Sequence, residues 1–214
     1  MKTIKEIQQD QQYSSMLAAA VEKFEKADPA LMAEKAGALW HPETKTITVE
    51  SLGETLSVSW PDGIMKPERE MWHHLVALHY LYQADGTPLT GDTVSFKDLT
   101  DGMVRGHGFD FSSQSDLQRM FLGKSEEQIR KCLTDAGGQE IRTKADFGVR
   151  FHMFPQYPLY INVWFADDEF PAQGKMLVDA SAPHYLMLED SVTAGEILLN
   201  RISEKMTGQP RFRK

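Results

Sequence analysis

The chain has 214 residues, of which 41% are hydrophobic and 25% are charged, a balance typical of a globular protein with a sizeable core. Its 31 acidic and 23 basic residues give a formal net charge of −8. A phosphate-binding surface needs clustered Lys and Arg, and the basic cluster here is the short terminal group Arg211, Arg213 and Lys214. The composition therefore argues against nucleic acids and anionic membranes as partners.

Cysteine content and the lack of long apolar runs indicate the cellular setting. Cys132 is the single cysteine, so one chain cannot build a disulfide framework, a Cys-ligated zinc site or an iron–sulfur site. The opening residues, MKTIKEIQQDQQ, lack the apolar stretch of a secretory signal, and no apolar run approaches the length of a membrane span. These features predict a cytoplasmic protein without a membrane segment.

The first part of the chain is expected to be helical. Apolar residues recur at helical spacing and predict an amphipathic helix over roughly residues 4–27. Asp28-Pro29 is typical of a helix start, and Gly37 is placed to end a short helix over residues 30–36. We expect three parts, which are a helical segment (1–36), an α+β domain (37–207) and a basic tail (208–214).

The middle of the chain contains strands, helices and a glycine-rich stretch. Period-two alternation predicts strands over residues 47–50 and 56–60, and residues 37–40 could add a third. Further elements are expected as helices over residues 68–83, 115–122 and 126–136, and as a short strand over residues 94–96. Three glycines within residues 102–111 predict an irregular, mobile segment.

The last third holds the clearest strand signals. Residues 145–153 alternate apolar with polar side chains, which predicts a half-buried strand. Nearly every position of residues 159–165 is apolar, so this strand is expected to be central and covered on both faces. A strand over residues 175–179 and a helix over residues 192–206, capped by Ser191, follow. Paired strands with segregated helices predict an α+β fold with one mainly antiparallel sheet.

The candidate binding residues cluster after the central strand. Asp168 and Glu169 lie between Trp164 and Phe170 in the sequence. Carboxylates at a strand end can ligate a hard cation or act as a general acid or base, and neighbouring aromatic rings can partly desolvate them. The alternative is a solvated turn that caps the next segment.

Two further residues complete the candidate ligand-binding set. Asp179 ends the following strand, and His79 flanks the apolar stripe of the helix over residues 68–83. The alternative for His79 is a hydrogen-bonded, half-buried histidine. Asp179, Ser181 and His184 lack a nucleophile-elbow pattern, so we interpret them as turn and cap residues. The histidine spacings suit no transition-metal site, and no catalytic residue is predicted.

Three stretches resemble a known family. They are LHYLYQADGTPLTGDTVSFKDLTDG, the Gly137-Gly138 pair and PLYINVWFADDEFPAQGKMLVDASAPHYLMLED. Over roughly residues 35–205, the chain resembles a prokaryotic family catalogued as domain of unknown function 3786. The resemblance implies a shared signature that contains Asp168, Glu169, Phe170, Pro171 and Asp179, and it implies no reaction. Some relatives carry a cysteine-rich iron–sulfur segment, and this chain has none of those cysteines.

Three functions are open at this point. The leading hypothesis is a binding or accessory protein that holds a small ligand or an unidentified cofactor near Asp168 and Glu169. The second is an enzyme that uses these carboxylates with a divalent metal and a histidine. The third is an interaction module that docks a protein partner through the N-terminal helix and the aromatic surface.

Overall fold

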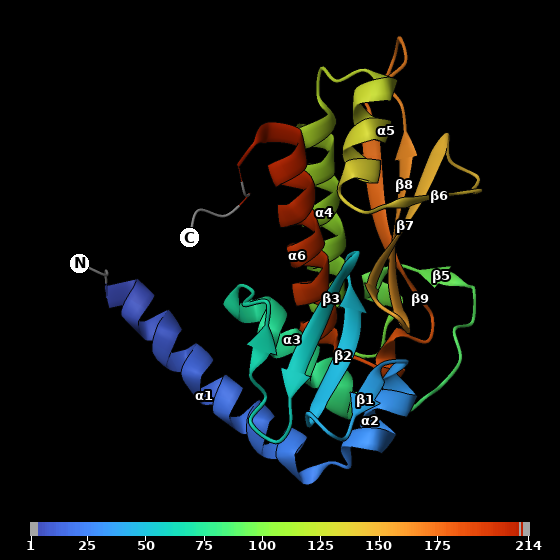
Figure 1. Ribbon diagram of the computed structural model, residues 1–214. Helices are drawn as coiled ribbons and strands as arrows, with labels where there is room; N and C mark the ends of the chain where they lie inside the picture. The colour runs from blue at the N-terminus through green and yellow to red at the C-terminus, as the bar shows by residue number, and fades with distance from the viewer. Residues whose placement is uncertain (1–3, 210, 212–214) are drawn as a thin grey trace.

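Helices and two antiparallel sheets make up the chain, and the computed structural model describes residues 4–209 and 211 (Figure 1). The α-helices of this part are α1 (Ile4–Lys26), α2 (Pro29–Ala36), α3 (Met71–Gln83), α4 (Arg105–Phe121), α5 (Glu126–Asp135) and α6 (Leu188–Thr207). Short 3₁₀ turns are η1 (Phe96–Asp98) and η2 (Ala182–His184). The predicted α+β class is confirmed.

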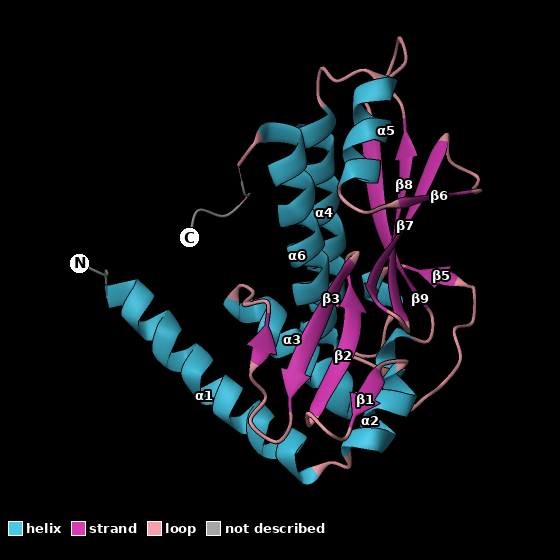
Figure 2. Cartoon of the chain, viewed as in Figure 1, coloured by secondary structure: helices cyan, strands magenta, loops and turns pink. Residues whose placement is uncertain are grey.

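The strands lie in two sheets (Figure 2). The four-stranded sheet runs in the order β1 (Leu39–His41), β2 (Thr46–Ser51), β3 (Glu54–Ser59), β4 (Met65–Lys66). The five-stranded sheet runs in the order β5 (Thr93–Val94), β9 (Gln173–Asp179), β8 (Tyr157–Trp164), β7 (Phe147–Phe154), β6 (Gln139–Ile141). The expectation of a single sheet is wrong, because the β2–β3 hairpin pairs only with β1 and β4. The Leu52 N–H donates to the His152 carbonyl at 2.7 Å and joins the two sheets at one point.

The N-terminal helices form as their end signals predict. The Asp28 carboxylate accepts a hydrogen bond from the Leu31 N–H at 2.9 Å, and Gly37 ends α2 in the left-handed region at φ 63°. Tyr13 of α1 meets Trp72 of α3 edge to face, with ring centroids 6.1 Å apart. α1 therefore packs on α3, and α2 contacts both α3 and β1.

β8 is the central strand of the five-stranded sheet, as predicted, but only its first part is covered on both faces. Leu159, Ile161 and Val163 are fully buried on the face where α4, α5 and α6 lie (Figure 2). On the other face Asn162 is half-buried and Trp164 is 41% exposed. The expectation that both faces are covered is therefore wrong for this end of β8, since no helix of the described chain lies over its second face.

The glycine-rich stretch over residues 102–111 is helical from Arg105 onward, so the prediction of an irregular, mobile segment is wrong. A Cβ on Gly106 would collide with the Phe96 carbonyl group. The Asp110 carboxylate accepts hydrogen bonds from the backbone N–H groups of Phe96 (3.1 Å) and Lys97 (3.0 Å). Gly106 therefore permits close packing of η1 on α4, and the expected short helix over residues 115–122 is the second half of α4.

α6 begins at Leu188, before the predicted start at residue 192. Ser191 is fully buried, and its backbone N–H donates to the Met187 carbonyl at 2.8 Å, so the predicted cap residue lies inside the helix. Met187 takes the N-cap position. Glu189 and Asp190 place negative charge in the first turn, where the positive end of the helix dipole favours it.

Candidate functional site

The six predicted ligand-binding residues do not form one group. Four lie at the end of β8 and in the turn before β9, namely Trp164, Asp168, Glu169 and Phe170. Asp179 lies six residues beyond Gln173, the cross-strand partner of Trp164, so Asp179 is about 20 Å away along the sheet. His79 belongs to α3.

Asp167 closes the acidic turn. Its carboxylate accepts hydrogen bonds from the N–H groups of Phe170 (2.7 Å) and Glu169 (2.9 Å), and its own N–H donates to the Phe170 carbonyl (3.0 Å). These backbone donors lower the pKa of Asp167 below its ordinary value. Asp168 and Glu169 are exposed, and neither side chain has a hydrogen bond or ion pair within the described part of the chain. Asp167 therefore stabilises the turn, and the other two carboxylates remain accessible.

Glu169→Gln should leave the free energy of unfolding unchanged within about 0.5 kcal/mol, because the substitution removes no internal bond and reduces repulsion between neighbouring acids. Asp167→Ala is the matched control and should be the more destabilising change, since it removes the acceptor of two backbone N–H groups. Urea unfolding of the two variants makes the comparison. Clear destabilisation by Glu169→Gln would assign Glu169 a structural role.

Asp179 fastens a loop to the end of β9. Its side chain is buried, and the two carboxylate oxygens accept hydrogen bonds from Thr90 N–H (3.0 Å), Thr90 Oγ1 (2.9 Å), Gly91 N–H (2.9 Å) and Ser181 N–H (2.9 Å). Burial raises the pKa of Asp179, but the donors on Ser181 and Thr90 outweigh burial and leave the pKa below its ordinary value. This carboxylate is occupied by the protein itself.

His79 joins α3 to α6. Its Nδ1 lies 2.8 Å from the Asp190 carboxylate, and the Tyr82 ring meets the imidazole edge to face at 5.5 Å. The hydroxyls of Tyr157 and Ser191 are buried beside Asp190, and burial raises the pKa of Tyr157. The geometry fits the alternative of a hydrogen-bonded, half-buried histidine.

Ser51 and His73 form a second buried pair, which the sequence did not indicate. The Ser51 hydroxyl lies 2.8 Å from His73 Nε2, and both side chains are buried. Burial lowers the pKa of His73 to about 4, so the ring is neutral at pH 7. The pair fastens the β2–β3 hairpin to α3. Only the tertiary structure brings residues 51 and 73 together.

The uncovered face of the five-stranded sheet carries a group of polar side chains around one tryptophan. We call this group the uncovered patch, and it consists of Arg150, Asn162, Trp164, Gln173 and Lys175. Cross-strand register sets Asn162 opposite Lys175, and Trp164 opposite Gln173 in the next row of the same face. No described residue bonds to the side chains of Asn162, Gln173 or Lys175.

Arg150 extends the patch by one row. It lies opposite Tyr160, and its Nη2 donates to the Gln139 side chain at 3.3 Å. The Arg150 Nε is buried without a hydrogen-bond partner, and no described carboxylate pairs with this guanidinium or with the Lys175 amine. Two uncompensated cations therefore lie on one face of an acidic protein. Of the patch residues, Trp164 was predicted from the sequence, whereas Arg150 and Lys175 lie on other strands of the sheet.

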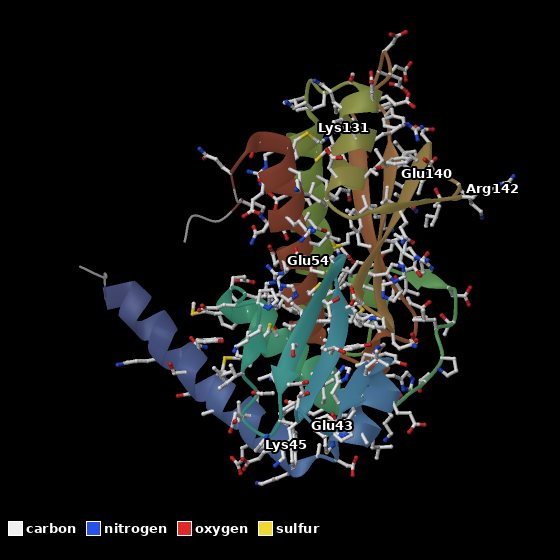
Figure 3. The ribbon with its side chains drawn as sticks, viewed as in Figure 1. Glu43, Lys45, Glu54, Lys131, Glu140 and Arg142 are labelled. Carbon is white, nitrogen blue, oxygen red and sulfur yellow. The ribbon has the colours of Figure 1, made fainter. Side chains whose placement is uncertain are left out.

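A shallow hollow borders the patch. Its volume is about 330 Å³, which is at the lower end of the usual range for ligand sites. Residues 140–143 and 145–148 line it, and Gly148 lies opposite Asn162 in the cross-strand register. Figure 3 shows Glu140 and Arg142 on β6 and the loop after it, at the outer edge of the sheet. The hollow therefore widens the surface next to Asn162.

The covered side of the sheet holds the end of β8 in place. The Arg130 guanidinium lies over the rings of Phe147 (4.4 Å) and Phe165 (5.0 Å), and it also pairs with Glu126 at 2.8 Å. The Phe165 N–H donates to the Asp146 carboxylate at 2.9 Å. These contacts hold Phe165 in place, and they therefore also fix the backbone position of its neighbour Trp164.

The described residues contain neither a cluster suited to a metal ion nor a helix suited to a membrane. No group of three or more His, Cys, Asp or Glu residues in this part of the chain could hold a metal ion. None of its helices has the length and apolar character needed to cross a membrane.

Comparison with known proteins gave one match. A family model described as Domain of unknown function (DUF3786) matches residues 28–201, which confirms the resemblance inferred over roughly residues 35–205. No curated protein and no solved structure matches the chain.

Proposed function

Because the chain belongs to the family described as Domain of unknown function (DUF3786), we propose its function from the candidate site alone. We propose that the chain binds a small anionic ligand with a flat ring on the uncovered patch. The observation that carries this proposal is the set of polar side chains around Trp164. The proposal keeps the hypothesis of a small-ligand or cofactor-binding protein and moves the site from the acidic turn to the adjoining sheet face.

The patch offers complementary chemistry for such a ligand. The indole of Trp164 provides a stacking surface, worth about 1–3 kcal/mol for a nucleobase-like ring. The amides of Asn162 and Gln173 supply both donors and acceptors. Lys175 and Arg150 attract a phosphate or carboxylate, and successive rows on one face are about 7 Å apart, so a nucleotide-sized molecule spans the patch.

The acidic turn sets the orientation of the ligand. Asp168 and Glu169 follow the end of β8 that carries Trp164, whereas Arg150 lies two rows further along the sheet. Hydroxyl or amine donors on the ligand would face the carboxylates, and the anionic group would face the cations. Two cations are too few for a nucleic acid, whose affinity comes from many phosphate contacts.

Fluorescence titration tests the proposal, with adenosine monophosphate as the probe. Ligand addition should change the emission of the wild-type protein, and Trp164→Phe should remove that change. Lys175→Gln should weaken binding about tenfold through loss of the phosphate partner. Lys66→Gln, on an exposed position of the other sheet, is the matched control and should bind like the wild type.

Two results would contradict the proposal. One is the absence of saturable binding of adenosine monophosphate, ribose 5-phosphate and flavin mononucleotide at millimolar concentration. The other is equal loss of affinity in Lys175→Gln and Lys66→Gln, because general charge screening would then explain the effect.

The outer side of α4 favours the interaction module as a second candidate. Phe111 in α4 and the two residues that flank this helix, Val104 and Leu122, are strongly exposed. Exposed apolar side chains at these positions are available for contact with a protein partner.

A further inference from the structure

Charge changes sign from one end of the uncovered patch to the other. The turn that follows Trp164 carries the exposed carboxylates of Asp168 and Glu169. The next row along the sheet carries Lys175, and the row after that carries Arg150. An anionic group is therefore repelled at one end of this face and attracted at two successive rows beyond it.

Arg150 and His152 form a donor-rich group at the far end of this face. They are two residues apart on β7 and therefore lie on the same side of the sheet. Arg150 Nη2 and His152 Nε2 share one acceptor, the side-chain oxygen of Gln139, at 3.3 Å and 3.4 Å. Both contacts are long for hydrogen bonds, and Arg150 Nε is buried without a partner. The group therefore holds more donors than acceptors.

No acidic side chain offsets this group. In the described part of the chain, no carboxylate forms an ion pair with Arg150 or with His152. Burial and the positive charge of Arg150 lower the pKa of His152, so the imidazole is mainly neutral at pH 7 and offers an N–H donor beside a permanent cation. A half-buried guanidinium without a counterion favours an anion from solution.

The two cations of the patch are arranged for two linked anionic groups. Lys175 lies on β9 and Arg150 on β7, with β8 between them, so their Cα atoms are about 12 Å apart across one row and two strand spacings. Gln139 is on β6, the strand beyond β7, and its contact with Arg150 holds the guanidinium on the side away from Lys175. Two linked phosphates allow each cation to keep its own position.

We propose that Arg150 and His152 form a second anion subsite on the uncovered patch, and that the ligand of the patch is a nucleoside diphosphate. The base stacks on Trp164, the first phosphate lies at Lys175, and the terminal phosphate lies at Arg150. This inference rests on the proposed function, because it names the class of ligand that the same site binds. The acidic turn disfavours the reverse orientation, since its carboxylates would then face a phosphate.

Isothermal titration calorimetry tests the second subsite by comparing adenosine diphosphate with adenosine monophosphate in buffer without divalent metal. The wild type should bind the diphosphate about tenfold more tightly, because the terminal phosphate adds a charge-assisted contact. Arg150→Gln should lower this preference to about twofold or less. Lys144→Gln is the matched control and should keep the full preference, since Lys144 is an exposed cation in the loop after β6 and lies outside the patch.

A second variant guards against loss of folding. Arg150→Lys keeps a cation but not the planar guanidinium, so its preference should lie between those of the wild type and Arg150→Gln. Circular dichroism checks the fold of each protein. The inference fails if the folded Arg150 variants keep the wild-type preference, or if Lys144→Gln loses it as well.

The same titrations separate this inference from the proposed function. Equal affinity of the wild type for the two nucleotides would overturn the second subsite and leave the proposed function standing. Absence of binding of either nucleotide would contradict both.

Discussion

Gly106→Ala should lower the free energy of unfolding by about 3 kcal/mol, the upper end of the usual range for overpacking. The added methyl would collide with the carbonyl group of Phe96 and with the Lys97 nitrogen, which are backbone atoms. Asp110 holds both residues through their N–H groups, so η1 cannot move without breaking these hydrogen bonds. The cost therefore comes from displaced backbone rather than from a shifted side chain.

Gly108→Ala is the matched control in the same helix. A Cβ at this position has no neighbour within 4 Å, and the residue is exposed. Alanine is a better helix former than glycine by about 0.5–1 kcal/mol, so this variant should be more stable than the wild type. Urea unfolding measures the free energy of unfolding of both variants. We expect a decrease for Gly106→Ala and an increase for Gly108→Ala. Destabilisation of similar size in both would mean that residues 105–108 need flexible backbone.

Asp179→Asn should lower the free energy of unfolding by about 2–3 kcal/mol, because hydrogen bonds to a charged acceptor are lost in a buried site. The carboxylate accepts four hydrogen bonds from Thr90, Gly91 and Ser181. An amide group places an N–H donor where one oxygen now accepts, so a buried backbone N–H loses its partner. Thermal or urea unfolding measures the loss, and the loop over residues 90–92 should show faster amide exchange.

The difference in stability between the wild type and Asp179→Asn should depend on pH, and the direction of this dependence follows from the pKa of Asp179. The pKa of Asp179 is lower in the folded protein than its ordinary value of 3.8, so the folded state binds fewer protons there than the unfolded state. Its contribution to stability is complete above pH 3.8 and is lost as the pH falls through the folded value. The gap between the wild type and Asp179→Asn should narrow on acidification below about pH 4.

Asp168→Asn is the control for charge removal alone. Asp168 is exposed and has no internal partner among the described residues, so its substitution should change stability by less than about 0.5 kcal/mol. Equal destabilisation by Asp168→Asn and Asp179→Asn would contradict the structural role assigned to Asp179.

Local signals in the sequence determined many helix ends and the order of elements. Asp28 and Gly37 bound α2, and Ser125 begins α5 with a complete capping box. The apolar run over residues 159–165 identified the central strand. Each of these signals acts between residues that are a few positions apart in the chain. Helix caps and the alternation of strand residues therefore do not depend on contacts with distant parts of the chain.

Only part of the candidate site could be predicted from the sequence. Trp164 was recognised because it stands next to an acidic turn. Arg150 and Lys175 were not, because their place beside Asn162 follows from the pairing of three strands. A one-residue slip in register would move every one of these side chains to the covered face.

The tertiary structure alone decided the division into two sheets, the role of Gly106 and the position of Arg211. Glycine in a sequence indicates freedom of the backbone. At Gly106, however, the Phe96 backbone occupies the space that a side chain would need. Residues 208–214 were expected to form a basic tail, and in the structure Arg211 bridges Asp116 and Glu196 on two helices. Such contacts depend on atoms that are distant along the chain, and their energies come from burial and close approach, which no local pattern contains.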